Sequence, residues 1–306
     1  MWSYALRRLL ATIPTLLAVI TVCYLLLHFT PGGPFDREHR IAPEVLANLN
    51  AKYHLDEPLW KQYLLYLNSV LHGDLGASFR YADWSVNELV AKALPVSATI
   101  GGGSLLISLF IGVALGCVAA LKQNSWIDYL VMLIGNVGSA FPSFVIGPVL
   151  ILVCAVWWQL LPAGGWSDFN PRYMVLPMTL LIFINVSTIG RVMRGSMIEV
   201  LSSNYIRTAR AKGLPMRTVV LRHALKPALL PVVSLIGPLA ISSITAAVVT
   251  ESVFSLPGLG KLIVNGAGNR DYTLVLGLVV LVTVIAVVFN LLVDLSYALL
   301  DPKIRY

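Results

Sequence analysis

The sequence contains few charged residues. Only 12% of its 306 residues are Asp, Glu, Lys or Arg, whereas 57% are hydrophobic, and an ordinary soluble domain carries roughly a quarter charged residues. A soluble core cannot bury that excess of apolar side chains. The apolar residues form long uncharged runs instead, and a run of about 20 residues crosses a bilayer as a helix. We therefore expect an all-α integral membrane protein.

Clusters of metal-binding or catalytic residues are also lacking. The cysteines Cys23, Cys117 and Cys154 lie in apolar runs without a Cys-x-x-Cys spacing, and the five histidines form neither HExxH nor His-x-His. Residues 255–262 come close to the phosphate-binding GxxxxGK[ST] but lack its first glycine and its final hydroxyl residue, and no span contains GxSxG. We expect no bound metal, no ATP binding and no enzymatic activity in this chain.

The apolar runs predict about six membrane-spanning helices. They cover residues 9–29, 97–121, 129–157, 174–193, 228–250 and 273–295. The first follows Arg7 and Arg8 like a signal peptide, but no small-x-small cleavage site follows it, so we interpret it as an uncleaved helix. Pro142 and Pro148 predict a kink in the third span.

The chain divides into three regions. Residues 1–30 hold the N-terminus and the first span, residues 31–96 are expected to form an extracytoplasmic helical cap, and residues 97–306 form a five-helix core. In the cap, Asp56 and Pro58 indicate a helix start, Gly73 indicates a stop, and Ser85 with Glu88 forms a capping-box pattern. In the core, a GxxxG pair at Gly112 and Gly116 is a candidate helix contact.

Basic residues gather in alternate connecting segments. If the N-terminus is inside, the inner segments hold only three acidic residues, Asp128, Glu199 and Asp301. The same segments hold a larger set of basic residues: Arg7, Arg8, Lys122, Arg191, Arg194, Arg207, Arg210, Lys212, Arg217, Arg222, Lys226, Lys303 and Arg305. This asymmetry follows the positive-inside rule and places both termini in the cytoplasm. The net charge of +7 is therefore a membrane-topology signal, and we expect no nucleic-acid partner.

The longest inner loop, residues 191–226, has the pattern of two short helices joined by a sharp turn. The first helix is expected to begin after Ser202 or Ser203 and to end at Gly213, because glycine adopts the left-handed conformation that stops a helix and Pro215 prevents its continuation. Tyr205, Ile206 and Ala209 would share one face. A solvated loop that only sets topology would explain the charge, but it would not explain this arrangement of helix signals, which suits insertion into a groove of a partner.

These residues resemble a known family. The segments 205–214, 221–225 and 229–231 (YIRTARAKGL, LRHAL and LLP) are similar to the EAA loop of ABC-importer permeases in its peptide-transporter version. Arg207-Thr208-Ala209 replaces the general Glu-Ala-Ala and Lys226 replaces a proline, as in the peptide and nickel branch. Further segments at 5–9, 73–78, 250–260 and 301–306 resemble the oligopeptide or dipeptide permease subunit with the long first outer loop, so the resemblance covers essentially the whole chain.

The resemblance implies a type I ABC-importer permease in a bacterial inner membrane, surrounded by lipid. It implies a heterodimer with a second permease, two cytoplasmic ATPases that bind ATP and Mg²⁺, and an extracytoplasmic peptide-binding protein. The ATPase-coupling residues would be Tyr205, Arg207, Thr208, Ala209, Arg210, Ala211, Lys212, Gly213, Leu214 and Pro215. The expected cargo is an oligopeptide, with a dipeptide or a nickel chelate as alternatives.

Polar residues within the spans are candidates for a translocation pathway, although each could instead bond to its own helix. They are Asn136, Ser139, Ser143, Asn185, Ser242 and Thr245. Glu251, at the outer end of the fifth span, is a candidate gate that could pair with Lys261 or Arg270. An ion-coupled secondary transporter remains the alternative from another class, although the spans contain almost no ionisable residue to carry a proton.

Overall fold

The computed structural model describes residues 2–30, 55–81 and 83–300, and the side chains of residues 12–30, 55–81, 83–138, 140–243 and 247–293. Within these residues the fold is helical, and the only β-type pairing is a single bridge between Ala77 and Ser85. Five helices are long and apolar enough to cross a membrane, and one sharply bent pair makes up to six. The expectation of an all-α protein with about six spans is confirmed. Parts of the expected cap (31–54) and the terminal motif (301–306) lie outside the described residues.

The described helices follow one another along the chain. Their bounds are α1 (Trp2–Phe29), α3 (Leu59–Leu71), α4 (Val86–Ser97), α5 (Gly103–Leu121), α6 (Trp126–Ala140), α7 (Ser143–Leu150), α8 (Pro171–Ser202), α9 (Asn204–Ala211), α10 (Met216–Thr218), α11 (Leu225–Val253), α12 (Leu259–Gly268) and α13 (Tyr272–Leu300). Three π-helical segments, η1 (Ala98–Gly102), η2 (Ile151–Trp157) and η3 (Val219–Ala224), join or extend them.

The second span begins earlier than its apolar run indicates. The predicted capping box is present: the backbone N–H of Glu88 donates to Ser85 Oγ and the carboxylate of Glu88 accepts from the backbone N–H of Ser85. From this cap a single helix of 36 residues runs from Val86 through η1 to Leu121. The expected boundary between cap and core at residue 96 therefore falls inside a continuous helix, because Pro95 sits within α4 without breaking it.

The third span is broken where we expected a kink. α6 ends at Ala140 and α7 starts at Ser143, with an angle of 104° between the two segments. Phe141 and Pro142 both have extended ψ values, of 130° and 144°. The value of Phe141 is expected, because proline disfavours the helical conformation of the residue before it. Pro148 lies inside α7 and does not interrupt it.

The inner loop is shorter than predicted. α8 continues for nine residues past the expected span end at Met193, to Ser202, and α10, η3 and α11 form one helix from Met216. The predicted first short helix exists as α9, but the second is the start of the fifth span. Only residues 203–215 therefore separate two long helices, and α9 lies between them.

A close helix contact joins α5 to α8. A Cβ built on Gly112 would approach Ile189 Cγ2 to 2.7 Å, and one on Gly116 would approach the carbonyl oxygen of Gly190 to 2.6 Å. The GxxxG pair therefore marks a real contact, in which two backbones meet because both glycines lack side chains.

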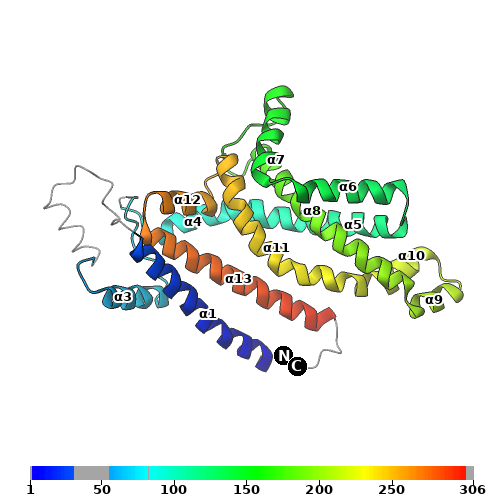
Figure 1. Ribbon diagram of the computed structural model, residues 1–306, viewed down its shortest axis with the longest axis horizontal. Coiled ribbons are helices and arrows are strands. Elements are labelled where there is room, and N and C mark those ends of the chain that lie inside the picture. Colours follow the sequence, from blue (N-terminus) through cyan, green and yellow to red (C-terminus); the bar gives the residue numbers. More distant parts are fainter. Residues whose placement is uncertain (1, 31–54, 82, 301–306) are drawn as a thin grey trace.

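The helices form a bundle with distinct ends (Figure 1). α9, α10 and the α5–α6 turn lie at one end, on the right in this view, whereas α3, α12 and the start of α4 lie toward the other. The charge pattern groups α9, α10 and the α5–α6 turn on one side of the membrane, and these segments are at the same end of the molecule. We call this the α9 end.

Candidate functional site

One face of α9 packs against neighbouring helices, and the opposite face is exposed. Ile206 is fully buried and Ala209 is 8% exposed, in a hydrophobic cluster with Met193 and Met197 of α8 and Val219 of η3. α9 therefore contacts both of the long helices that flank it. A displacement of α9 would be transmitted to α8 and to the helix that becomes α11, because packed interiors resist compression.

The opposite face of α9 and the following turn form what we call the α9 surface. Its exposed members are Tyr205, Arg207, Thr208, Arg210, Ala211, Lys212, Gly213, Leu214 and Pro215. The prediction that Tyr205 shares the face of Ile206 was wrong, because Tyr205 is 49% exposed. Ala209, in contrast, lies on the buried side with Ile206, so it packs inside the bundle and is not part of the α9 surface.

The turn after α9 has the predicted conformation. Gly213 has φ +76° and its backbone N–H donates to the carbonyl of Arg210 at 2.9 Å, which closes the helix end. A Cβ added to Gly213 would meet no atom within 4 Å. Within this chain Gly213 is therefore required for its backbone conformation only, and the space beside it is open. Pro215 then caps the helix that starts at Met216.

Glu251 is fully buried, whereas the sequence suggested an exposed charge at a helix end. Its carboxylate accepts from Ser97 Oγ at 2.5 Å and from the backbone N–H groups of Gly260 at 2.7 Å and Lys261 at 3.2 Å. These N–H groups belong to the first turn of α12, where a negative charge is stabilised. Glu251 thus fixes α12 to α4 and α11, and it bonds to the backbone of Lys261 where we had considered an ion pair.

The candidate pathway residues whose side chains are described differ in burial and in hydrogen bonding. Asn185 is buried and donates to Ser243 Oγ on α11 at 3.3 Å, whereas Asn136 is exposed on α6. The hydroxyl of Ser242 bonds to its own helix at Leu239, 3.0 Å away, and Ser143 opens α7. The side chains of Ser139 and Thr245 lie outside the described residues. Asn185 and Ser243 therefore join α8 to α11, and the pathway assignment remains a prediction.

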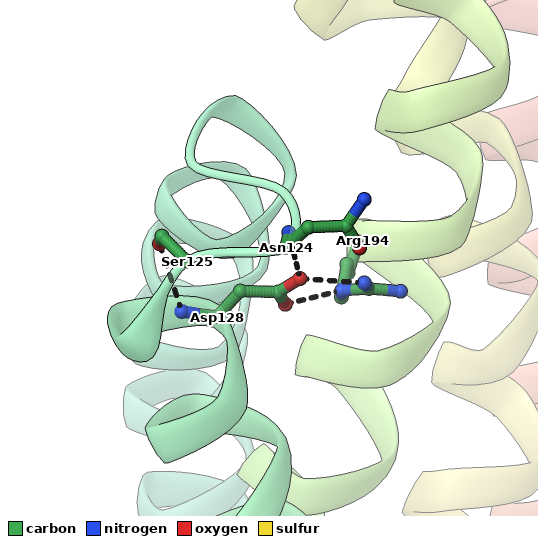
Figure 2. Close-up of polar contacts among 4 residues, drawn as sticks. All are labelled: Asn124, Ser125, Asp128 and Arg194. Carbon is green, nitrogen blue, oxygen red and sulfur yellow. Dashed lines mark hydrogen bonds and ion pairs between the residues drawn. The ribbon is translucent and has the colours of Figure 1, made fainter.

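A buried ion pair lies at the α9 end (Figure 2). Asp128 Oδ1 is 2.5 Å from Arg194 Nε and its Oδ2 is 2.7 Å from Arg194 Nη2, a bidentate arrangement between α6 and α8. Asp128 also accepts from the backbone N–H of Asn124 at 2.9 Å and caps the start of α6 together with Ser125. The α5–α6 turn is thereby held against α8 beside α9.

The family is decided by matches along both halves of the chain. Residues 112–306 match the family described as "Binding-protein-dependent transport system inner membrane component", and residues 1–99 match the family that describes the N-terminal part of the membrane component of such systems. The chain belongs to this family. Its members are multi-pass components of an inner membrane, which agrees with the helices described above.

Relatives match the chain from end to end. The "Oligopeptide transport system permease protein OppB" of Salmonella typhimurium is 52% identical over 306 residues, with all of both chains covered, and that of Escherichia coli K12 is 51% identical over the same length. The "Dipeptide transport system permease protein DppB" of Bacillus subtilis is 39% identical, covering all of this chain and 98% of the relative.

A solved structure shares the family's fold. A chain of the MetNI methionine ABC transporter in an inward-facing conformation matches with a TM-score of 0.60 and 16% identity, covering 70% of this chain and 96% of that chain. At this identity the match shows the fold alone. It confirms the expectation of a fold like that of ABC-importer permeases.

Two buried carboxylates of this family member were missed by sequence reasoning. One is Asp128, whose position three residues after the cap Ser125 was the available signal. The other is Asp271, which is fully buried before α13. It accepts from Ser78 Oγ and from the backbone N–H groups of Phe79, at 3.2 Å, and Leu274, at 3.1 Å. Asp271 therefore attaches the 73–81 segment to the end of the bundle opposite the α9 end, through contacts that no local pattern could reveal.

Proposed function

We propose that this chain is the permease subunit of an ATP-driven importer of oligopeptides and forms half of its translocation pathway. The proposal is supported by full-length relatives named as oligopeptide permeases at 51–52% identity, above the 39% of a dipeptide permease. We further propose a second, homologous permease as its partner, two ATPases that bind ATP and Mg²⁺, and a peptide-binding protein outside. Both termini and the α9 surface would face the cytoplasm.

The coupling role rests on one observation: one face of α9 is buried against two spanning helices while the opposite face is exposed. Arg207, Arg210 and Lys212 point a basic surface outward, while Ile206 and Ala209 insert between two spanning helices. A partner that binds the α9 surface can move α8 and α11 as rigid bodies. Such a movement would convert nucleotide-driven closure of the ATPases into the switch between inward-facing and outward-facing states.

The buried carboxylates give little support to the alternative that this chain is an ion-coupled secondary transporter. Among the described residues, the buried carboxylates Asp128, Glu251 and Asp271 each accept several hydrogen bonds, and Asp128 is paired with Arg194. A proton carrier must gain and lose its charge in the cycle. Asp128 is held in a bidentate ion pair with Arg194, and such a pair stabilises its ionised form.

Affinity purification of the chain from its native membrane tests the proposal. We expect a second permease and two ATPases to co-purify, and Gly213→Arg to reduce recovery of the ATPases at least tenfold while the chain remains inserted. Gly73→Arg is the matched control, because Gly73 also follows a helix end, has φ +78° and has open space around it, but at the other end of the molecule.

Both arginine variants place a side chain in a left-handed position, at a cost of about 1–2 kcal/mol. Because both variants carry this cost, a difference in ATPase recovery between them reports on the surface that each arginine covers. Recovery of the chain alone from membranes that preserve complexes, or equal loss of the ATPases in both variants, would contradict the coupling role of the α9 surface.

A further inference from the structure

A groove of about 330 Å³ lies between α5, α6 and α8, apart from the α9 surface and the buried carboxylates. Its walls are apolar and include Leu115 and Val118 of α5, Leu130 and Ile134 of α6, and Phe183 and Val186 of α8. Val118, Leu130 and Ile134 are 41–45% exposed, so the groove opens sideways from the bundle. We call it the lateral groove.

The two ends of the lateral groove differ in chemistry. At the α9 end it is lined by Arg191 and Trp126, both of them exposed, and at the other end by Gly135 and Phe183. Tryptophan prefers the level of lipid headgroups, and the long side chain of an arginine can extend its guanidinium group to the same level. The charged end of the lateral groove is therefore placed at a membrane surface and its apolar end within the hydrocarbon.

The length of the lateral groove matches one leaflet. From Trp126 to Gly135 the α6 helix rises about 14 Å at 1.5 Å per residue, and half of a hydrocarbon core of about 30 Å is about 15 Å. The lateral groove thus extends from the headgroup level to about the bilayer midplane, as one acyl chain does.

The lateral groove is apolar along α6, so it suits a slender apolar occupant. A single hydrocarbon chain is thin enough to enter.

We propose that the lateral groove binds an acyl chain of an anionic phospholipid, with Arg191 contacting the lipid phosphate. Lys122 adds a second exposed cation at the same end of the molecule, whereas the nearby Asp128 is neutralised by Arg194. This favours a headgroup that carries net negative charge over a zwitterionic one. In the orientation proposed above the lipid belongs to the cytoplasmic leaflet, but its binding depends on neither the cargo nor ATP hydrolysis.

Photo-crosslinking on the intact complex tests the lipid site. A benzophenone side chain would replace Val118, and the complex would be reconstituted in vesicles of phosphatidylglycerol and phosphatidylethanolamine in equal amounts. We expect an adduct with the mass of phosphatidylglycerol, reduced about fivefold by Arg191→Gln, as follows from the loss of one cation near an anionic headgroup. Arg217→Gln, which removes an exposed arginine outside the lateral groove, should leave the adduct unchanged.

A second variant tests the apolar part of the site. Gly135→Leu should abolish the adduct by filling the lateral groove, because a Cβ at Gly135 meets its nearest neighbour at an ordinary 3.7 Å. Co-purification of partner subunits reports separately on folding and on the proposed function. An adduct to a second permease, equal labelling by the two lipids, or an Arg191→Gln adduct as strong as that of Arg217→Gln would overturn the proposal.

Discussion

Single buried polar residues determine how α12 and the start of α13 are held. Glu251 and Asp271 each tie a helix start to a segment far away in the sequence. Each carboxylate accepts hydrogen bonds from backbone N–H groups and a serine. Because an unpaired buried donor costs about 1–3 kcal/mol, such sites tolerate little change.

Glu251→Gln should lower the midpoint temperature of thermal unfolding of the purified complex. The amide places an NH₂ group where a carboxylate oxygen accepts from Ser97 or from the two N–H groups of α12, so at least one buried donor loses its partner, at about 1–3 kcal/mol. The control is Glu199→Gln on the exposed surface of α8, which should change stability by less than about 0.5 kcal/mol. Normal stability with abolished uptake would instead show a gating role for Glu251.

The Asp128–Arg194 pair should behave as a coupled unit. Removing either partner by alanine substitution leaves a charge in a site where Asp128 is 2% and Arg194 24% exposed, at a cost of about 3–5 kcal/mol. A double-mutant cycle, followed by denaturant unfolding of the purified chain, should give a coupling energy of about 2 kcal/mol. Additive effects of the two substitutions would show that the bidentate contact contributes nothing to stability.

At the scale of the element, local signals gave some boundaries and failed at others. The start of α4 at Ser85 and the end of α9 before Gly213 were predictable, because capping residues act within one turn. The break at Pro142 was expected only as a kink, since proline permits either outcome. The continuity of α10 with α11 was missed because a basic surface on a helix end resembles a loop when read by charge alone.

The α5–α8 contact is an element-scale feature open to direct test. Gly116→Leu should prevent normal packing of α5 on α8, because even its Cβ would meet Gly190 O at 2.6 Å and Met193 Cβ at 2.7 Å. We expect a loss of at least about 3 kcal/mol, or no folded protein, measured as the fraction of chain that remains monodisperse after extraction.

Gly195→Leu on α8 is the matched control for this substitution, since a Cβ there meets nothing within 4 Å. Equal recovery of the two leucine variants would remove the assigned role of the GxxxG pair. The GxxxG pattern could be recognised in the sequence, but the helix that it contacts could not be predicted, because that depends on how α5 and α8 are placed relative to each other.

At the scale of the whole molecule, segments distant in sequence gather at two ends with different chemistry (Figure 1). The α9 end carries the basic α9 surface, the Asp128–Arg194 pair and the charged rim of the lateral groove, whereas the other end carries α12 and the buried carboxylates that hold it. Composition and charge were sufficient to predict the spans and this grouping. The burial of Glu251 could not be predicted, because its partner Ser97 is 154 positions away.

The most direct test of the account is peptide uptake into proteoliposomes that contain this chain, a second permease and two ATPases. With a loaded peptide-binding protein outside, we predict uptake of a labelled oligopeptide that requires ATP and is abolished by Gly213→Arg but not by Gly73→Arg. Uptake driven by an ion gradient, in liposomes that hold this chain without any ATPase, would contradict the account.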